Sequence, residues 1–196
     1  NPLGREQFLN ACGAQMEAEV RNVQRFLNAS DDAPTNREVR SEIQERMTRH
    51  GAFMRSAEGV AQALRGARKL RKTVAEKGIR LSGRGELNAA FQNEHLCLTH
   101  MAFLETIRAY IERGGGSRGG YVIADPEGKL QVETKRGTDL PHRPENEAMR
   151  AEILETALGA GGSFQVKPVQ VRPLPQDESW YETTWQAWRE GKVFEK

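Results

Sequence analysis

The chain has 196 residues, with 29 Lys and Arg against 27 Asp and Glu and a net charge of +2. This length suits one domain with a sizeable core, and near-neutral charge gives no general case for nucleic acid or a membrane surface as partner. No apolar run approaches the roughly 18 residues that a membrane span needs. We therefore expect a cytoplasmic protein without a membrane-spanning helix.

The two cysteines lack metal or redox spacing, and we interpret them as small buried thiols in predicted helices: Cys12 and Cys97. The chain opens with "NPLGREQF", which contains neither an initiator Met nor a signal-like apolar segment. From this opening we expect a fragment or a processed subunit of a larger protein.

The first part of the chain predicts three amphipathic helices. Apolar residues at three- and four-residue steps predict one stripe of a first helix: Phe8, Cys12, Met16, Val20, Val23 and Leu27. Thr35 followed by Glu38 is a capping-box pattern for a second helix, and Ser56 is a plausible N-cap for a third. The third helix carries a basic cluster without interleaved aromatics, which favours a solvated face over an RNA site: Arg65, Arg68, Lys69, Arg71 and Lys72.

A fourth helix is predicted over about 86–112, and from Leu96 onward it is apolar almost all round. A helix with so little polar surface must be covered on several sides, so we expect it at the centre of a bundle. His95 and His100 lie five residues apart on this helix, where a metal pair needs a spacing of three or four. We therefore predict no metal site.

The fourth helix runs into "YIERGGGSRGGYV", residues 110–122, which contains five glycines. Its GxGxxG-like spacing follows a helix and opens a strand, the reverse of a dinucleotide-binding loop, and no GK[ST] phosphate loop is present. Gly114 is interpreted as a left-handed helix stop, with Arg113 complementing the helix dipole. The remaining glycines indicate close approach to another surface.

The C-terminal part is expected to be mixed. Two β-prone runs flank the turn "DPEG" and predict a hairpin, "PENEAMRAEILETAL" (144–158) predicts a helix, and "SFQVKPVQVRP" (163–173) predicts an edge strand. A last helix carries three tryptophans that need a covering partner: Trp180, Trp185 and Trp188. The predicted fold class is mainly α, with a helical bundle of about four long helices in 1–113. A glycine-rich seam, a small α+β appendage and an aromatic tail occupy 114–196.

The order of these motifs resembles the C-terminal helical domain of the fumarate reductase/succinate dehydrogenase flavoprotein family, which includes aspartate oxidase and adenylylsulfate reductase. "REVRSEIQERMTRHGAFMRSAEGVAQAL" is similar to one family stretch, with Met47 and Arg55 in the expected places. The segment 86–120 resembles the long central helix that ends in "R.ESRG.H", and Ser117-Arg118-Gly119 match its SRG. The tail resembles a C-terminal extension of a divergent branch found in multidomain oxidoreductases.

The chain departs from the family pattern at several positions. Gly116 replaces the usual Glu, one residue is inserted after Arg113, and Tyr121 stands near the usual His. The family's "DYP" is only echoed by Asp125-Pro126. These departures make the chain a divergent relative within that resemblance.

The resemblance implies a flavoenzyme that binds FAD in a Rossmann-like domain and transfers hydride to or from a carbon–carbon bond. The dinucleotide fingerprint, the capping domain and the catalytic arginine of that family have no counterpart here. We therefore expect no catalytic, cofactor-binding or metal residues in this chain, with FAD held by a partner domain or subunit. The expected interface residues are Ser117, Arg118, Gly119, Trp180, Trp185 and Trp188.

Arg118 is expected to pair with a carboxylate or with backbone carbonyls across the interface. A plain surface loop is the competing interpretation of Ser117 and Arg118. Two other functions remain open at this point: a stand-alone helical protein–protein interaction module without flavin chemistry, and an RNA-binding protein that uses the basic third helix and the RGG segment.

Overall fold

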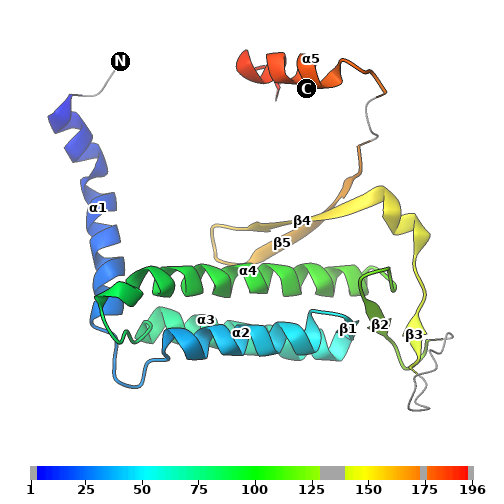
Figure 1. The fold of residues 1–196 in the computed structure, drawn as a ribbon, viewed down its shortest axis with the longest axis horizontal. Coiled ribbons are helices and arrows are strands. Elements are labelled where there is room, and N and C mark those ends of the chain that lie inside the picture. Colours follow the sequence, from blue (N-terminus) through cyan, green and yellow to red (C-terminus); the bar gives the residue numbers. More distant parts are fainter. Residues whose placement is uncertain (1–3, 129–139, 173–175, 194–196) are drawn as a thin grey trace.

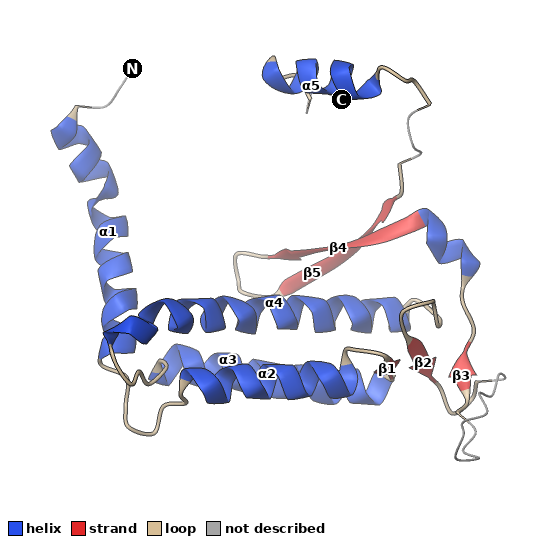
Figure 2. Cartoon of the chain, in the orientation of Figure 1, coloured by secondary structure: helices blue, strands red, loops and turns tan. Residues whose placement is uncertain are grey.

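The computed structural model describes residues 4–128, 140–172 and 176–193, and it confirms the mainly helical fold class (Figure 1). The helices are α1 (Arg5–Leu27), α2 (Asn36–His50), α3 (Ala57–Lys77), α4 (Leu87–Glu112) and α5 (Trp180–Arg189). Two 3-10 turns, η1 (Arg84–Glu86) and η2 (Glu147–Ala151), precede α4 and the fourth strand. Figure 2 shows that the strands lie in the C-terminal half, apart from a two-residue one before α3.

Helices α2, α3 and α4 form the bundle, and α4 is its central helix as predicted, although Leu96 and Phe103 of its apolar surface stay exposed, at 36% and 60%. One core cluster joins α3 and α4 to the segment after α4: Val60, Ala63, Leu64, Ala67, Met101, Leu104, Ile107, Ile111 and Ile123. A second cluster joins the opposite end of the bundle to the last turn of α1: Phe26, Val39, Ile43, Leu70, Val74, Ile79, Ala90 and Cys97. The Thr35–Glu38 capping box and the Ser56 cap are confirmed by their hydrogen bonds.

The predicted apolar stripe of α1 does not reach the core. Phe26 is the one buried residue of the helix, while Phe8, Met16 and Val20 are about half exposed, at 52%, 53% and 54%. Helix α1 is fastened only near its C-terminal end, where Arg25 pairs with Glu94 at 2.6 Å, and the rest stands off the bundle (Figure 1). The apolar stripe predicted the helix correctly. The burial that such a stripe implies was wrong, because α2, α3 and α4 already enclose the core by packing onto one another.

A small mixed sheet fastens the end of α4 to the start of α3. Its strands are β1 (Met54–Arg55), β2 (Val122–Ala124) and β3 (His142–Arg143), in the order β1-β2-β3. β1 runs parallel to β2, and β2 runs antiparallel to β3. The first run of the predicted "DPEG" hairpin is therefore a strand, paired with β1 and β3, while most of its second run lies outside the described residues.

The helix predicted over 144–158 is wrong. Residues Glu147–Ala151 form the turn η2, and Glu152–Leu158 form β4, which pairs antiparallel with β5 (Phe164–Gln170). Alternate β4 residues are half-buried, and Thr156 hydrogen-bonds Thr106 of α4 at 2.5 Å. Pairing with β5 and packing on α4 thus outweigh local helix propensity. The predicted strand over 163–173 is confirmed as β5.

Helix α5 follows the hairpin and stands away from the bundle (Figure 1). It is a ten-residue helix with no buried residue. Among the described residues, no helix combines the length and apolarity that crossing a membrane requires.

Candidate functional site

The glycine-rich segment after α4 contains three glycines that the chain itself requires. Gly114 ends the helix with φ +83°, the left-handed region that glycine favours. A Cβ on Gly115 would lie 2.4 Å from the Tyr110 ring, and a Cβ on Gly116 would lie 1.6 Å from the Pro144 carbonyl oxygen. The positive φ of Gly114, the Tyr110 ring and the Pro144 carbonyl oxygen thus account for Gly114, Gly115 and Gly116 without any partner molecule.

Ser117 fastens the segment to the small sheet. Its hydroxyl donates to the Arg143 carbonyl oxygen at 2.6 Å and accepts the Ile123 N–H at 3.0 Å. Ile123 is 1% exposed, so this hydroxyl is the acceptor for a buried backbone donor. Ser117 therefore serves the fold of its own chain.

Arg143 closes the base of the segment, a role that its position in the sequence did not indicate. Its guanidinium donates to the carbonyl oxygens of Ile111 at 2.9 Å and Gly115 at 3.3 Å. It also pairs with Asp125, with donor–acceptor distances of 3.0 and 2.8 Å. The hydrogen bond from Arg143 lowers the pKa of Asp125, so the carboxylate stays charged.

Residues Arg118–Tyr121 form a tight turn that points outward, which we call the SRG turn. Arg118 and Tyr121 exchange backbone hydrogen bonds of 3.1 and 2.8 Å around Gly119 and Gly120. Both glycines are exposed, neither has a positive φ, and a Cβ on either would meet nothing within 4 Å. Neither backbone conformation nor packing within the described chain requires glycine at these two positions.

Arg118 has a carboxylate partner in its own chain. Its Nε lies 3.0 Å from a Glu145 oxygen, and Arg150 binds the same carboxylate at 2.6 Å. Hydrogen bonding by Arg150, assisted by the charge of Arg118, lowers the pKa of Glu145. A pairing of Arg118 across an interface stays a prediction.

Arg55 lies beside the SRG turn and links it to the start of α3. Its guanidinium stacks 4.0 Å from the centroid of the Tyr121 ring, and its Nε donates to the Gly51 and Ala52 carbonyl oxygens. Burial raises the pKa of Tyr121 to about 12, so the phenol remains neutral. Arg55, Arg118 and Tyr121 also line a hollow of about 260 Å³ between α4 and β4.

The three tryptophans lie apart from the SRG turn, on α5. Trp185 and Trp188 stack with centroids 5.0 Å apart, and Trp180 packs edge-on to Tyr181 at 6.1 Å. The exposed fractions of Trp180, Trp185 and Trp188 are 44%, 51% and 57%. The structure thus divides the predicted interface residues between two separate places.

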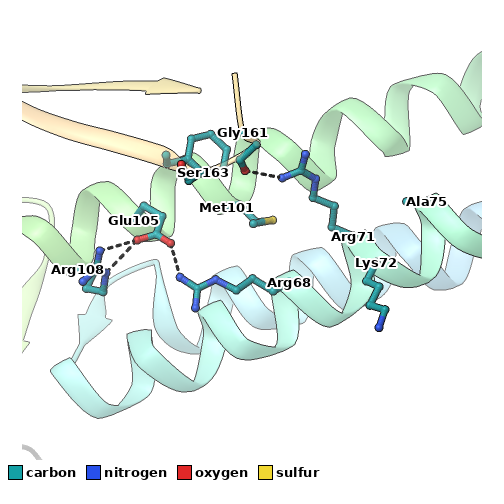
Figure 3. Close-up of a pocket in the computed structure, with 11 residues that line it drawn as sticks. Arg68, Arg71, Lys72, Ala75, Met101, Glu105, Arg108, Gly161 and Ser163 are labelled. Carbon is teal, nitrogen blue, oxygen red and sulfur yellow. Dashed lines mark hydrogen bonds and ion pairs between the residues drawn. The ribbon is translucent and has the colours of Figure 1, made fainter. Parts of the chain in front are cut away.

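A basic pocket of about 570 Å³ lies between α3, α4 and the turn of the β4–β5 hairpin (Figure 3). Its charged lining residues are Arg68, Arg71, Lys72, Glu105 and Arg108. Glu105 is 6% exposed and binds Arg68 at 2.7 Å and Arg108 at 2.9 Å, as the dashed lines of Figure 3 show. Three residues of the basic cluster predicted to be a solvated face therefore line a pocket.

No protein-family model matches this chain, and no curated protein matches it.

Two other buried titratable groups of α4, Cys97 and His100, line neither the SRG turn nor the basic pocket. Burial raises the pKa of Cys97 to about 11, which keeps the thiol protonated and unreactive. Burial lowers the pKa of His100, whose ring nitrogens face the Leu96 carbonyl oxygen at 3.0 Å and Arg46 at 3.4 Å. Cys97 is buried as predicted, whereas Cys12 is only half-buried. Among the described residues, no group of three or more His, Cys, Asp or Glu side chains is placed to bind a metal.

Proposed function

We propose that this chain is the C-terminal structural and interface part of an FAD-dependent oxidoreductase that resembles fumarate reductase/succinate dehydrogenase flavoproteins. It packs against a separate flavin-binding portion through the outward face of the SRG turn, and it is not catalytic alone. The observation that carries the proposal is the pair Gly119 and Gly120, which are exposed and meet nothing within 4 Å in their own chain. Glycine at such positions lets another backbone approach closely.

The spatial meeting of two separately matched motifs supports the proposal. Arg55 belongs to the first stretch that resembles the family, and Tyr121 follows the SRG match at the end of the second. The two side chains stack at 4.0 Å, although the whole of α3 and α4 lies between them in the chain. The stretch that contains Arg55 and the stretch that ends in the SRG match thus form one local structure, which is a physical reason for them to occur in the same chain.

The uncovered apolar faces of α1 and α5 also support the proposal. Phe8, Met16 and Val20 line one side of α1, and the tryptophans crowd α5, all about half exposed. Large apolar side chains left exposed together on one helix are typical of protein–protein contact surfaces. A flavin-binding portion that covers these helices would bury surface that the chain alone leaves in water.

A reconstitution experiment tests the proposal. The tagged chain is co-expressed with an FAD-binding polypeptide of this family, taken from the coding sequence upstream of Asn1 or from a neighbouring gene. Co-purification and retained flavin absorbance are then measured. The expected result is a flavin-containing complex, whereas the chain purified alone carries no flavin. Absence of any complex with such polypeptides would overturn the proposal.

A matched pair of variants locates the interface. A Cβ added at Gly119 meets nothing within 4 Å in the described chain, and the same holds at Gly85 in the turn η1, which precedes the opposite end of α4. Gly119→Leu and Gly85→Leu are therefore compared. Overpacking a close contact costs about 1–3 kcal/mol, which corresponds to a complex weakened roughly 5- to 160-fold. We expect this loss for Gly119→Leu and none for Gly85→Leu. Equal affinities of the two variants for the FAD-binding polypeptide would show that the SRG turn is not part of the interface.

The alternative is a stand-alone helical interaction module without flavin chemistry. The independent core of α2, α3 and α4 favours it, as does the absence of unsatisfied buried side-chain polar atoms among the described residues. This alternative expects a monodisperse monomer whose tryptophan fluorescence does not change when the FAD-binding polypeptide is added.

A further inference from the structure

The basic pocket between α3, α4 and the β4–β5 turn is not used by the function proposed above. Four cationic side chains and one carboxylate line it, so the lining itself is net positive, while Lys72 and Arg108 also pair outside the lining with Glu76 at 3.7 Å and Glu112 at 2.9 Å. Positive charge gathered in a hollow, with low-dielectric walls, attracts anions more strongly than the same charges on a flat surface.

The single carboxylate of the lining does not oppose an anion, because its charge is already paired twice. Glu105 accepts from Arg68 at 2.7 Å and from Arg108 at 2.9 Å, and Arg108 is held further by Glu112 at 2.9 Å. The buried Glu105 thus orients two guanidiniums at one side of the pocket (Figure 3). The Nε–H and the second amino group of Arg68 stay available for a ligand.

The hairpin turn supplies the opposite side of the pocket. Arg71 donates to the Gly162 carbonyl oxygen at 3.2 Å, and Gly162 has φ +75°, a conformation that favours glycine. This contact holds a Gly-Gly-Ser turn against α3, with Gly161, Gly162 and Ser163 in the pocket lining. Within the described chain the Ser163 hydroxyl has no hydrogen-bond partner, so it is a further donor for an anion.

The floor of the pocket is apolar. Met101 is 5% exposed, Phe164 packs against the same core cluster, and Ala75 lies at the rim. The volume of about 570 Å³ falls within the range of small-molecule sites. A ligand that satisfies both features carries phosphate groups next to a flat apolar ring system.

We propose that this pocket binds a small phosphate-bearing molecule with a flat apolar group, of the size and chemistry of a nucleoside diphosphate. Its phosphates lie among Arg68, Arg71 and Lys72, and its ring system lies on Met101 and Phe164. A nucleic-acid polymer fits less well, because single strands follow extended grooves with exposed aromatic platforms, whereas the hairpin turn bounds this hollow on one side.

Calorimetric titration of the purified chain tests the proposal with ADP, inorganic pyrophosphate and adenosine as separate probes. Lys72→Glu reverses a charge in the lining, whereas Lys69→Glu makes the same change on an exposed part of α3 outside it. Circular dichroism checks that both variants keep the helical fold. A reversed charge near a phosphate weakens binding about tenfold or more, and the effect shrinks as salt rises.

The expected result is one ADP bound per chain, with weaker binding of pyrophosphate and adenosine. We expect Lys72→Glu to lose about tenfold in affinity and Lys69→Glu to stay within about twofold of the parent. Absence of ADP binding, or equal losses in both variants, overturns the proposal. A pyrophosphate affinity equal to that of ADP overturns the assignment of the apolar floor. A single-stranded RNA oligonucleotide that binds more tightly than ADP overturns the small-molecule assignment.

Discussion

Removing the Ser117 hydroxyl should destabilise the chain, because that hydroxyl satisfies a buried backbone donor. In Ser117→Ala the Ile123 N–H loses its acceptor at 3.0 Å, while Ile123 itself is 1% exposed. A buried unsatisfied N–H costs about 1–3 kcal/mol. The Arg143 carbonyl oxygen keeps its bond from the Ser117 N–H at 2.9 Å, so the acceptor side adds little. We therefore expect the free energy of unfolding to fall by about 1–3 kcal/mol.

Urea denaturation followed by circular dichroism measures this loss, and amide hydrogen exchange of Ile123 localises it. Ser117→Thr keeps a hydroxyl and should restore most of the stability and of the Ile123 protection. Ser82→Ala is the matched control, because Ser82 is exposed and contributes only its backbone N–H to a hydrogen bond, at 2.9 Å to Glu86. A Ser117→Ala loss no larger than that of Ser82→Ala, with Ile123 still protected, would refute the reasoning.

The remaining predictions concern two backbone positions and one buried histidine. Gly116→Ala places a Cβ 1.6 Å from the Pro144 carbonyl oxygen and should lower the free energy of unfolding by at least about 1–3 kcal/mol. Gly119→Ala, which meets nothing within 4 Å, should leave it unchanged in the same urea titration. Burial lowers the pKa of His100, so the unfolded chain takes up a proton near pH 6.5 that the folded chain accepts only at lower pH. Stability should be constant above about pH 7 and fall below about pH 6.5 by up to about 1.4 kcal/mol per pH unit. His100→Gln should remove this slope and His95→Gln should retain it, and an unchanged slope in His100→Gln would contradict the assignment.

The elements that local signals determine were predictable from the sequence. The capping box of Thr35 and Glu38 and the Ser56 cap depend on hydrogen bonds within a few residues, and both are present. The central place of α4 followed from its nearly continuous apolar surface, which only burial on several sides can satisfy. Sequence signals that act within one helix or its cap can be interpreted without knowing how the rest of the chain folds.

The errors arose where a distant segment decides the outcome. The stripe of α1 has the right period, but burial needs an opposing surface, and α2, α3 and α4 pack onto one another instead. The segment 152–158 has good local helix propensity and becomes a strand because β5 supplies its hydrogen bonds. Strand formation depends on partners more than helix formation does.

The same dependence explains why the basic pocket was missed. The pocket needs the turn of the β4–β5 hairpin above α3, and a helix over 144–158 would have left no such turn. The charges of α3 were visible in the sequence, but the surface opposite to them was not. The requirement for Gly115 and Gly116 was hidden in the same way, since it comes from the Tyr110 ring and the Pro144 carbonyl oxygen.

Ser117 and the SRG turn that follows it therefore have inward and outward roles in neighbouring residues. Ser117 fastens β2 and β3, whereas Arg118, Gly119 and Gly120 face outward. Arg118 already pairs with Glu145, but the two side chains remain 41% and 26% exposed, and ion pairs open to solvent contribute little in water. Glu145 keeps Arg150 if Arg118 moves, so a carboxylate or a carbonyl oxygen on a docked surface can take over Arg118 without leaving a bare charge behind. The internal pair is thus compatible with the proposed interface role of Arg118.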